Sequence, residues 1–182
     1  MVLSRVQVSS APAERDADRD LEPPFDQLVE HTDDAVQLGD VEVLEQHAMI
    51  AAHLEGPVAR EPWVQTVEYD PAIPRWYVRF GCDGRDAATI YFDLHQRTLR
   101  YEVYFIPDPP GHHEELYRFM LQRNHALYGA HFSIGPDGDC YLVGRVLLEH
   151  LDVAELDRII GVLYELVERW FQVAIGIAFR RG

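Results

Sequence analysis

Apolar and polar residues follow two different periods along this chain, and the period predicts the type of each element. Apolar residues recur at helical spacing after Asp40 until Gly56 and Pro57 break the pattern, which predicts a first helix over this stretch. Apolar and polar residues then alternate in four short runs that are separated by Pro, Gly and Asp. These runs, which predict an antiparallel meander of strands, begin at Trp63, Arg75, Ala88 and Thr98.

The helical period returns in HHEELYRFMLQRNHALYG, which predicts a second helix that stops at Gly129. A turn sequence, GPDGD, then lies between the apolar runs HFSI and CYLVGRVLL, and this arrangement predicts a β-hairpin. Pro136 presets the φ angle of such a turn, while Gly138 tolerates a positive φ. The last helix is predicted to begin after Asp152, which with Glu155 forms a variant of the capping box. This order of elements favours an α+β fold, in which an antiparallel sheet made of the meander and the hairpin packs against helices.

Strand alternation divides the side chains of the meander between two opposite faces. One face is almost entirely apolar and is expected to lie against the helices; it carries Trp76, Val78, Phe80, Ile90, Phe92, Leu94, Leu99, Tyr101, Val103 and Phe105. The other face combines Glu102 with many Arg and Tyr residues, which are frequent at the energetic centres of protein interfaces. Arg and Tyr also cover the outer side of many sheets, so a purely structural role stays open. We expect partner binding by Arg75, Tyr77, Arg79, Tyr91, Arg100 and Tyr104.

The charge of the chain limits the partners that this face can have. The 182 residues include 31 Asp and Glu against 16 basic residues, which gives a net charge of -15. Such a charge repels phosphate backbones and anionic lipid headgroups, so neither nucleic acid nor a membrane surface is expected as a partner. Every basic residue is Arg, which excludes mechanisms that need a lysine amine, such as a Schiff base or a Walker motif.

The acidic residues are dense at the N-terminus, where little apolar periodicity is present. We expect residues 1–39 to form a flexible acidic extension and residues 40–182 to form the folded domain. The only two cysteines, Cys82 and Cys140, lie far apart and outside any C-x-x-C spacing, which fits a reducing compartment. A disulfide between them stays open. Because the N-terminus also has no continuous apolar run of the secretory type, the expected location is the cytoplasm.

The C-terminal apolar stretch, residues 159–179, raises the question of a membrane span. The stretch is interrupted by three charged residues, Glu165, Glu168 and Arg169, which argue against a membrane span. Its last part, VAIGIAF, either continues the final helix over the core or forms an exposed contact of a homodimer.

Catalytic and metal-binding patterns are weak. A zinc-protease motif needs a second histidine four residues after His113, and Tyr117 occupies that position. The GPDGD turn supplies too few oxygen ligands for an EF-hand, and the acidic surroundings of Cys140 disfavour a reactive thiolate paired with His131. We therefore expect no catalytic residue, no cofactor and no metal. The alternative is a metal-binding protein or enzyme that uses His112, His113, His125 and His131.

The second half of the chain carries an ordered set of core and turn residues. They are Tyr117, Leu121, Asn124 and Leu127 in the helix, Phe132, Ile134 and Gly138-Asp139 in the first strand and turn, Tyr141, Leu142, Val146 and Leu148 in the second strand, and Leu151, Glu155 and Leu156 at the last helix. In this order they resemble the YbjN-like domain family of bacterial sensory transduction regulators, whose fold is similar to that of type III secretion chaperones. The resemblance implies a non-enzymatic, chaperone-like adaptor or regulator that binds a protein partner and often forms dimers. It supplies no catalytic residues.

Overall fold

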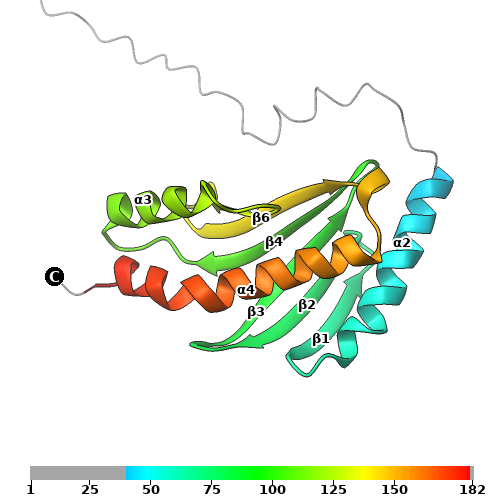
Figure 1. The fold of residues 1–182 in the computed structure, drawn as a ribbon, viewed down its shortest axis with the longest axis horizontal. Coiled ribbons are helices and arrows are strands. Elements are labelled where there is room, and N and C mark those ends of the chain that lie inside the picture. Colours follow the sequence, from blue (N-terminus) through cyan, green and yellow to red (C-terminus); the bar gives the residue numbers. More distant parts are fainter. Residues whose placement is uncertain (1–39, 181–182) are drawn as a thin grey trace, which may run out of the picture. The chain divides into compact units, whose positions relative to one another are not determined.

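The computed structural model describes residues 40–180, which form an open sheet and the helices that cover it (Figure 1). The predicted N-terminal extension, residues 1–39, lies outside the described residues. The elements in chain order are α2 (Asp40–Glu55), η2 (Val58–Arg60), β1 (Val64–Asp70), β2 (Arg75–Cys82), β3 (Arg85–Leu94), β4 (Thr98–Ile106), α3 (His113–Asn124), β5 (His131–Ile134), β6 (Cys140–Leu147), η3 (Leu148–His150) and α4 (Val153–Ala178).

The six strands are antiparallel and lie in the order β1-β2-β3-β4-β6-β5. The predicted meander therefore forms β1 to β4, and the predicted hairpin joins it through β6, which leaves β5 at the edge. Helix α4 crosses one face of the sheet, with α3 beside β5 and α2 beside β1 (Figure 1). This confirms the predicted α+β fold.

The division of the strands into two faces also agrees with the sequence pattern. Every residue that alternation assigns to the apolar face is buried, except Leu94, which is half-buried near the end of β3. Directly paired residues such as Trp76 and Phe92 lie on this face, because opposite residues of an antiparallel pair point the same way. Together with α4 side chains such as Leu163, they form a single core between the sheet and the helices.

The second helix ends at Asn124 and not at Gly129 as the sequence predicts. The side chain of Asn124 explains this difference, since its amide oxygen accepts from the Phe132 N–H at 2.8 Å and its amide nitrogen donates to the Phe132 carbonyl at 3.0 Å. These two hydrogen bonds tie the end of α3 to the edge strand β5. Gly129 has a φ of 79° in the loop that follows, which is a conformation that favours glycine.

The final helix begins as predicted, because the Asp152 side chain accepts from the Glu155 N–H at 2.7 Å. The helix continues through the apolar tail as far as Ala178, and both Ala174 and Ala178 are 0% exposed. The tail therefore continues the helix: its alanines cover the core, while Val173 and Phe179 are exposed. Among the described residues, no helix combines the length and the apolar character that crossing a bilayer requires.

Candidate functional site

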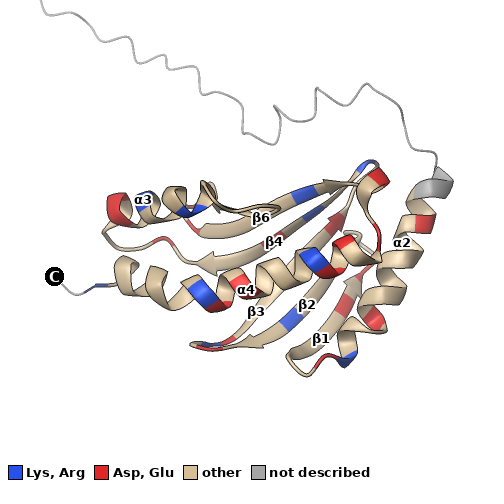
Figure 2. Ribbon diagram, in the orientation of Figure 1, with Lys and Arg blue, Asp and Glu red and all other residues tan. Residues whose placement is uncertain are grey.

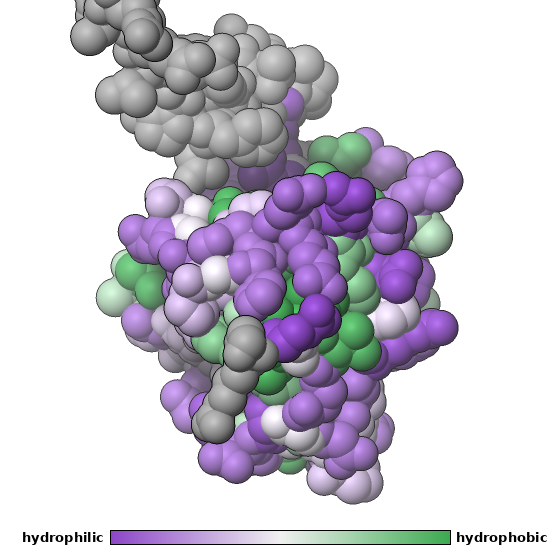
Figure 3. Space-filling model, turned by 90° about the vertical axis from the view of Figure 1, so that its left-hand side faces the viewer, coloured by the Kyte–Doolittle hydropathy of each residue, from purple (hydrophilic) through white to green (hydrophobic). Residues whose placement is uncertain are grey.

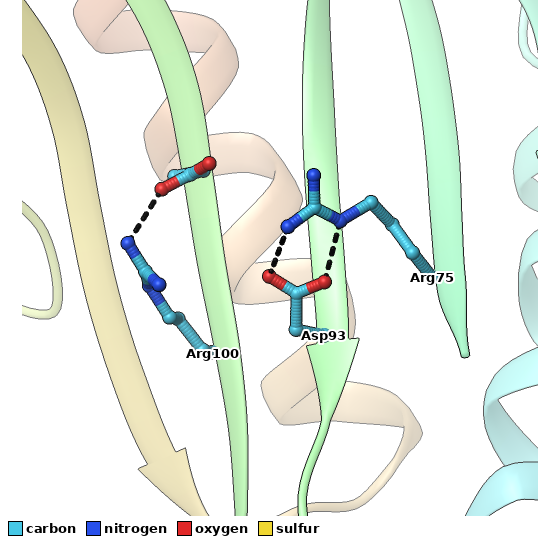
Figure 4. A network of polar contacts seen from close by, with 4 residues as sticks. Arg75, Asp93 and Arg100 are labelled. Atoms are coloured by element: carbon cyan, nitrogen blue, oxygen red, sulfur yellow. Dashed lines mark hydrogen bonds and ion pairs between the residues drawn. The ribbon is translucent and has the colours of Figure 1, made fainter. Parts of the chain in front are cut away.

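The face of the sheet opposite α4 carries the residues that the sequence predicts for partner binding. Figure 4 looks onto this face, with α4 behind the strands and the side chains of Arg75, Asp93 and Arg100 in front of them. The described helices contribute their buried residues to the core on the other side. The structure thus brings the predicted side chains together on one surface that no described helix covers.

Two of the predicted arginines are engaged by carboxylates of the same face. Arg75 binds Asp93 through two hydrogen bonds, from Nε to Oδ1 at 2.5 Å and from Nη2 to Oδ2 at 2.9 Å. Asp93 is only 8% exposed, and its hydrogen bond to Arg75 raises the pKa of that guanidinium. Arg100 donates from Nη2 to Glu102 Oε2 at 2.8 Å. These pairs fix both arginines on the sheet. The positive charge of Arg75 offsets the cost of burying the negative charge of Asp93.

Tyrosine pairs occupy the middle of the face. The Tyr77 and Tyr91 rings meet edge to face with centroids 5.5 Å apart, and the Arg75 guanidinium lies 5.4 Å from the Tyr91 centroid. Tyr104 meets Tyr141 of β6 in the same way at 5.6 Å. Burial, and after it the nearby Asp139, raises the pKa of both Tyr104 and Tyr141, so their hydroxyls stay neutral hydrogen-bond donors.

The strand residues of this face carry no net charge, although the chain is strongly acidic and the turn residues Asp137 and Asp139 lie near Tyr141. Cross-strand register aligns Asp70 with Arg75 and Glu68 with Tyr77, and it aligns Arg100 with Arg145. The charged residues of this face are four arginines and four carboxylates, Arg75, Arg79, Arg100, Arg145, Glu68, Asp70, Asp93 and Glu102. A neutral surface rich in tyrosine is suited to desolvation by a protein partner.

Two residues of this face, Tyr141 and Arg145, are absent from the sequence-based set. Both lie on β6, opposite Tyr104 and Arg100 respectively. The alternation within CYLVGRVLL places them on the same side of their own strand, and that signal is present in the sequence. What the sequence pattern lacks is the strand order, since nothing in it shows that β6 pairs with β4.

The four histidines of the alternative metal site do not come together. His112 and His113 lie at the start of α3, where His113 contacts Asp108 at 3.1 Å, and His125 follows the end of this helix. Twelve helical residues separate these two ends by about 18 Å. His131 lies farther on, as the first residue of β5. Within residues 40–180, no group of three or more His, Cys, Asp or Glu side chains could hold a metal ion.

The GPDGD segment forms the predicted hairpin turn. Gly138 has a φ of 85°, and the Gly138 N–H donates to the Gly135 carbonyl at 3.0 Å. Asp139 accepts from the Asp108 N–H at 2.8 Å, which joins the turn to the loop before α3. Cys140 is 0% exposed, and burial raises the pKa of its thiol to about 11, so it is not poised as a nucleophile. Both Cys140 and Cys82 are free thiols.

Sequence comparison supports the resemblance seen in the second half of the chain. Residues 88–175 match the model of the YbjN family, described as "Putative bacterial sensory transduction regulator". The uncharacterized protein Rv0487 of Mycobacterium tuberculosis is 35% identical over 85 residues, which are 47% of this chain and 46% of that protein. The chain thus matches less than half the length of this relative. ML2442 of Mycobacterium leprae is 28% identical over 135 residues, which are 74% of this chain and 70% of that protein.

Two solved structures share the fold. A chain of the ExsC–ExsE complex matches with a TM-score of 0.52 and 16% identity, over 72% of this chain and 95% of that one. A chain of the HopA1–SchA chaperone–effector complex also matches with a TM-score of 0.52, at 14% identity, over 74% of this chain and 99% of the other. The predicted similarity to type III secretion chaperones is therefore confirmed for the fold.

Proposed function

We propose that this chain, whose residues 88–175 match the YbjN family, is a non-enzymatic protein-binding module that acts in the bacterial cytoplasm as a chaperone-like adaptor or regulator. The domain, residues 40–182, binds its partner through the sheet face opposite α4. The proposed partner-binding residues are Arg75, Tyr77, Arg79, Tyr91, Arg100 and Tyr104. We add Tyr141 and Arg145 to this proposal because they lie opposite Tyr104 and Arg100.

The observation that carries this proposal is a tyrosine-rich sheet face whose strand residues balance four arginines against four carboxylates, on a chain with a net charge of -15. A uniformly solvated surface on such a chain would share its acidic excess, whereas this face balances arginines against carboxylates. Tyrosine rings offer large contact areas at a low cost in side-chain entropy, which suits a binding surface. One of the matched folds occurs in a chaperone–effector complex, which supports the same class of function.

A variant with Arg79→Gln, Tyr77→Ser and Tyr104→Ser tests this face. Arg75 and Arg100 are left in place because Asp93 and Glu102 bind them, so replacing them would also disturb the sheet. The expected result is an at least tenfold loss of the proteins that the intact chain captures from the source cell, because the central contact area is removed. Quantitative mass spectrometry of the captured proteins measures this loss, and circular dichroism checks that the variant is folded.

The control for this experiment is a Leu44→Ser, Arg60→Gln variant, which removes an exposed apolar side chain and an arginine from α2 and η2. It should capture the same proteins as the intact chain. If the face variant is folded and still captures them in full, the sheet face is not the binding surface.

Homodimer formation is a second part of the proposal, and exposed apolar residues at the end of α4 support it. Val173 is 44% exposed and Phe179 is 40% exposed. Figure 3 looks at this end of the domain, where apolar surface is visible among polar residues. Light scattering should therefore report twice the mass of one chain for the intact protein and the mass of one chain for a Val173→Asp, Phe179→Asp variant.

A Leu44→Asp, Leu121→Asp variant serves as the control for the dimer, because these side chains are 67% and 68% exposed elsewhere on the domain. It should keep the dimer mass. A monomeric intact protein would contradict the homodimer, and dissociation of the control would show that the contact does not lie at the end of α4.

A further inference from the structure

A groove of about 550 Å³ lies between α3 and α4, on the helical side of the domain. Its apolar lining includes Leu127, Val162 and Leu166, and its charged lining consists of three arginines and one carboxylate, Arg123, Arg158, Arg169 and Glu165. Figure 2 shows that basic and acidic residues both occur along α3 and α4. A mostly apolar groove with several convergent cations is a recognised form of binding site.

The arginines of the groove are held in place by aromatic rings. The Arg123 guanidinium lies 4.9 Å from the Phe119 centroid and 4.7 Å from the Trp170 centroid, and Arg169 lies 5.0 Å from the same indole. Arg158 lies 5.1 Å from the Tyr128 ring. Cation–π contacts fix the position of a guanidinium but leave the N–H groups in its plane free to bind an anion.

The donors of two of these arginines are not satisfied by close carboxylates. Arg158 is fully engaged, because Glu155 accepts from it at 2.7 and 2.6 Å. Arg169 lies 3.8 Å from Glu165, which is too long for a hydrogen bond. Among residues 40–180, no carboxylate pairs with Arg123, and its enclosed Nε atom has no acceptor. Because this Nε atom is enclosed, an incoming anion would bind the Nη groups of Arg123, which line the groove and have no acceptor among the described residues.

We infer that the α3–α4 groove binds an acidic, amphipathic peptide segment of a protein partner. A carboxylate of the segment accepts from Arg123 and Arg169, and its apolar side chains pack on Leu127 and Leu166. Charge complementarity carries this choice, since the groove is lined by three arginines and one carboxylate, Glu165, on a chain whose net charge is -15. Glu155 binds Arg158, which leaves Arg123 and Arg169 as the cations that the segment meets. The inference extends the proposed protein-binding function to a second surface, on the opposite side of the sheet from the tyrosine-rich face.

A peptide titration tests the groove directly. The probe is a synthetic peptide of about twelve residues in which Leu recurs three and four positions apart and Glu fills the other positions. Its counterpart has Gln in place of every Glu. The readout is the indole N–H signal of each of the three tryptophans in nitrogen–proton correlation spectra. Trp170 lies at the groove, whereas Trp63 packs against Phe80 and Tyr164, and Trp76 is buried in the core.

The Glu peptide should shift the Trp170 signal in a saturable way and leave those of Trp63 and Trp76 in place. The Gln peptide should bind at least tenfold more weakly. Arg169→Gln, at a 62% exposed side chain that can change without loss of the fold, should weaken binding about tenfold, and Arg123→Gln together with it should weaken binding further. The Arg79→Gln, Tyr77→Ser, Tyr104→Ser variant should bind the peptide normally.

Several outcomes would contradict peptide binding in the α3–α4 groove. These are an unchanged Trp170 signal at millimolar peptide, equal binding of the Gln peptide, or unchanged affinity in the arginine variants. Saturation by sodium acetate at the same concentration would indicate a small-anion site and not a peptide groove. Peptide binding that is lost only in the sheet-face variant would reject the groove and support the tyrosine-rich face. If the sheet-face variant still captured the partner proteins in full while the peptide bound the groove, only the proposal that the sheet face binds partners would be rejected.

Discussion

Gly144→Ala should destabilise the domain by about 2–3 kcal/mol, because the methyl group of the new alanine would clash with neighbouring atoms. A Cβ atom at this position would lie 2.4 Å from the Gly129 carbonyl oxygen and 2.3 Å from the Tyr101 ring. The Tyr101 hydroxyl donates to the same carbonyl, so strand β4, strand β6 and the loop after α3 all meet here. Backbone cannot rotate away as a flexible side chain can. Thermal unfolding should show a fall in Tm of roughly 5–10 °C.

Gly161→Ala provides the matched control, since it is the same substitution in the exposed part of α4. Nothing lies within 4 Å of a Cβ atom there. Alanine is favoured over glycine inside a helix, so this variant should be stabilised by about 0.5–1 kcal/mol. The two substitutions should therefore have opposite signs. Equal stability of the Gly144→Ala variant and the intact protein would mean that the junction between Gly144, Tyr101 and Gly129 is not tightly packed in solution.

Asn124→Ala should cost about 2 kcal/mol, because it removes two hydrogen bonds to the backbone of Phe132, each of which contributes about 1 kcal/mol. The Asn124 amide takes the place that a neighbouring strand would otherwise occupy beside β5. Its loss uncovers an edge, and exposed edges promote pairing between molecules. Hydrogen exchange of the Phe132 amide should become at least tenfold faster, and light scattering should show more self-association.

Gln122→Ala is the control for the Asn124→Ala variant. Gln122 is exposed on the same helix and forms no hydrogen bond in the described part of the chain. Its stability should stay within about 0.5 kcal/mol of the intact protein. If the Phe132 amide remained equally protected after Asn124→Ala, another group would have to close the edge of β5.

Asn124 also shows what the sequence can and cannot predict. The family resemblance includes this residue in its pattern, but nothing in the local sequence indicates its bond to Phe132. Helix periodicity continues past Asn124 towards Gly129, whereas the observed helix ends at Asn124, where the contact with Phe132 lies. Local pattern therefore predicts the existence and type of the helix, while its end depends on a contact with another element.

The candidate site divides in the same way. A period of two residues predicts which side chains of the meander share a face, because successive side chains of a strand point to opposite sides. The pairing of Arg100 with Arg145, and of Tyr104 with Tyr141, depends instead on the position of β6 next to β4. The pairing of Arg75 with Asp93 likewise follows from cross-strand register. Residue types could be predicted, but the balance of charges on the face required the strand order.

The position of α4 after all six strands has a consequence for synthesis on the ribosome. The apolar side of the meander is translated before Leu163 of α4, which covers it; Val103, for example, precedes Leu163 by roughly 60 residues. At a translation rate of about 5–20 residues per second, this interval lasts about 3–12 seconds. During that time the nascent sheet exposes much of its core surface to water. Each molecule of this protein therefore passes through a stage in which its core surface is open to other molecules unless the ribosome or a chaperone shields it.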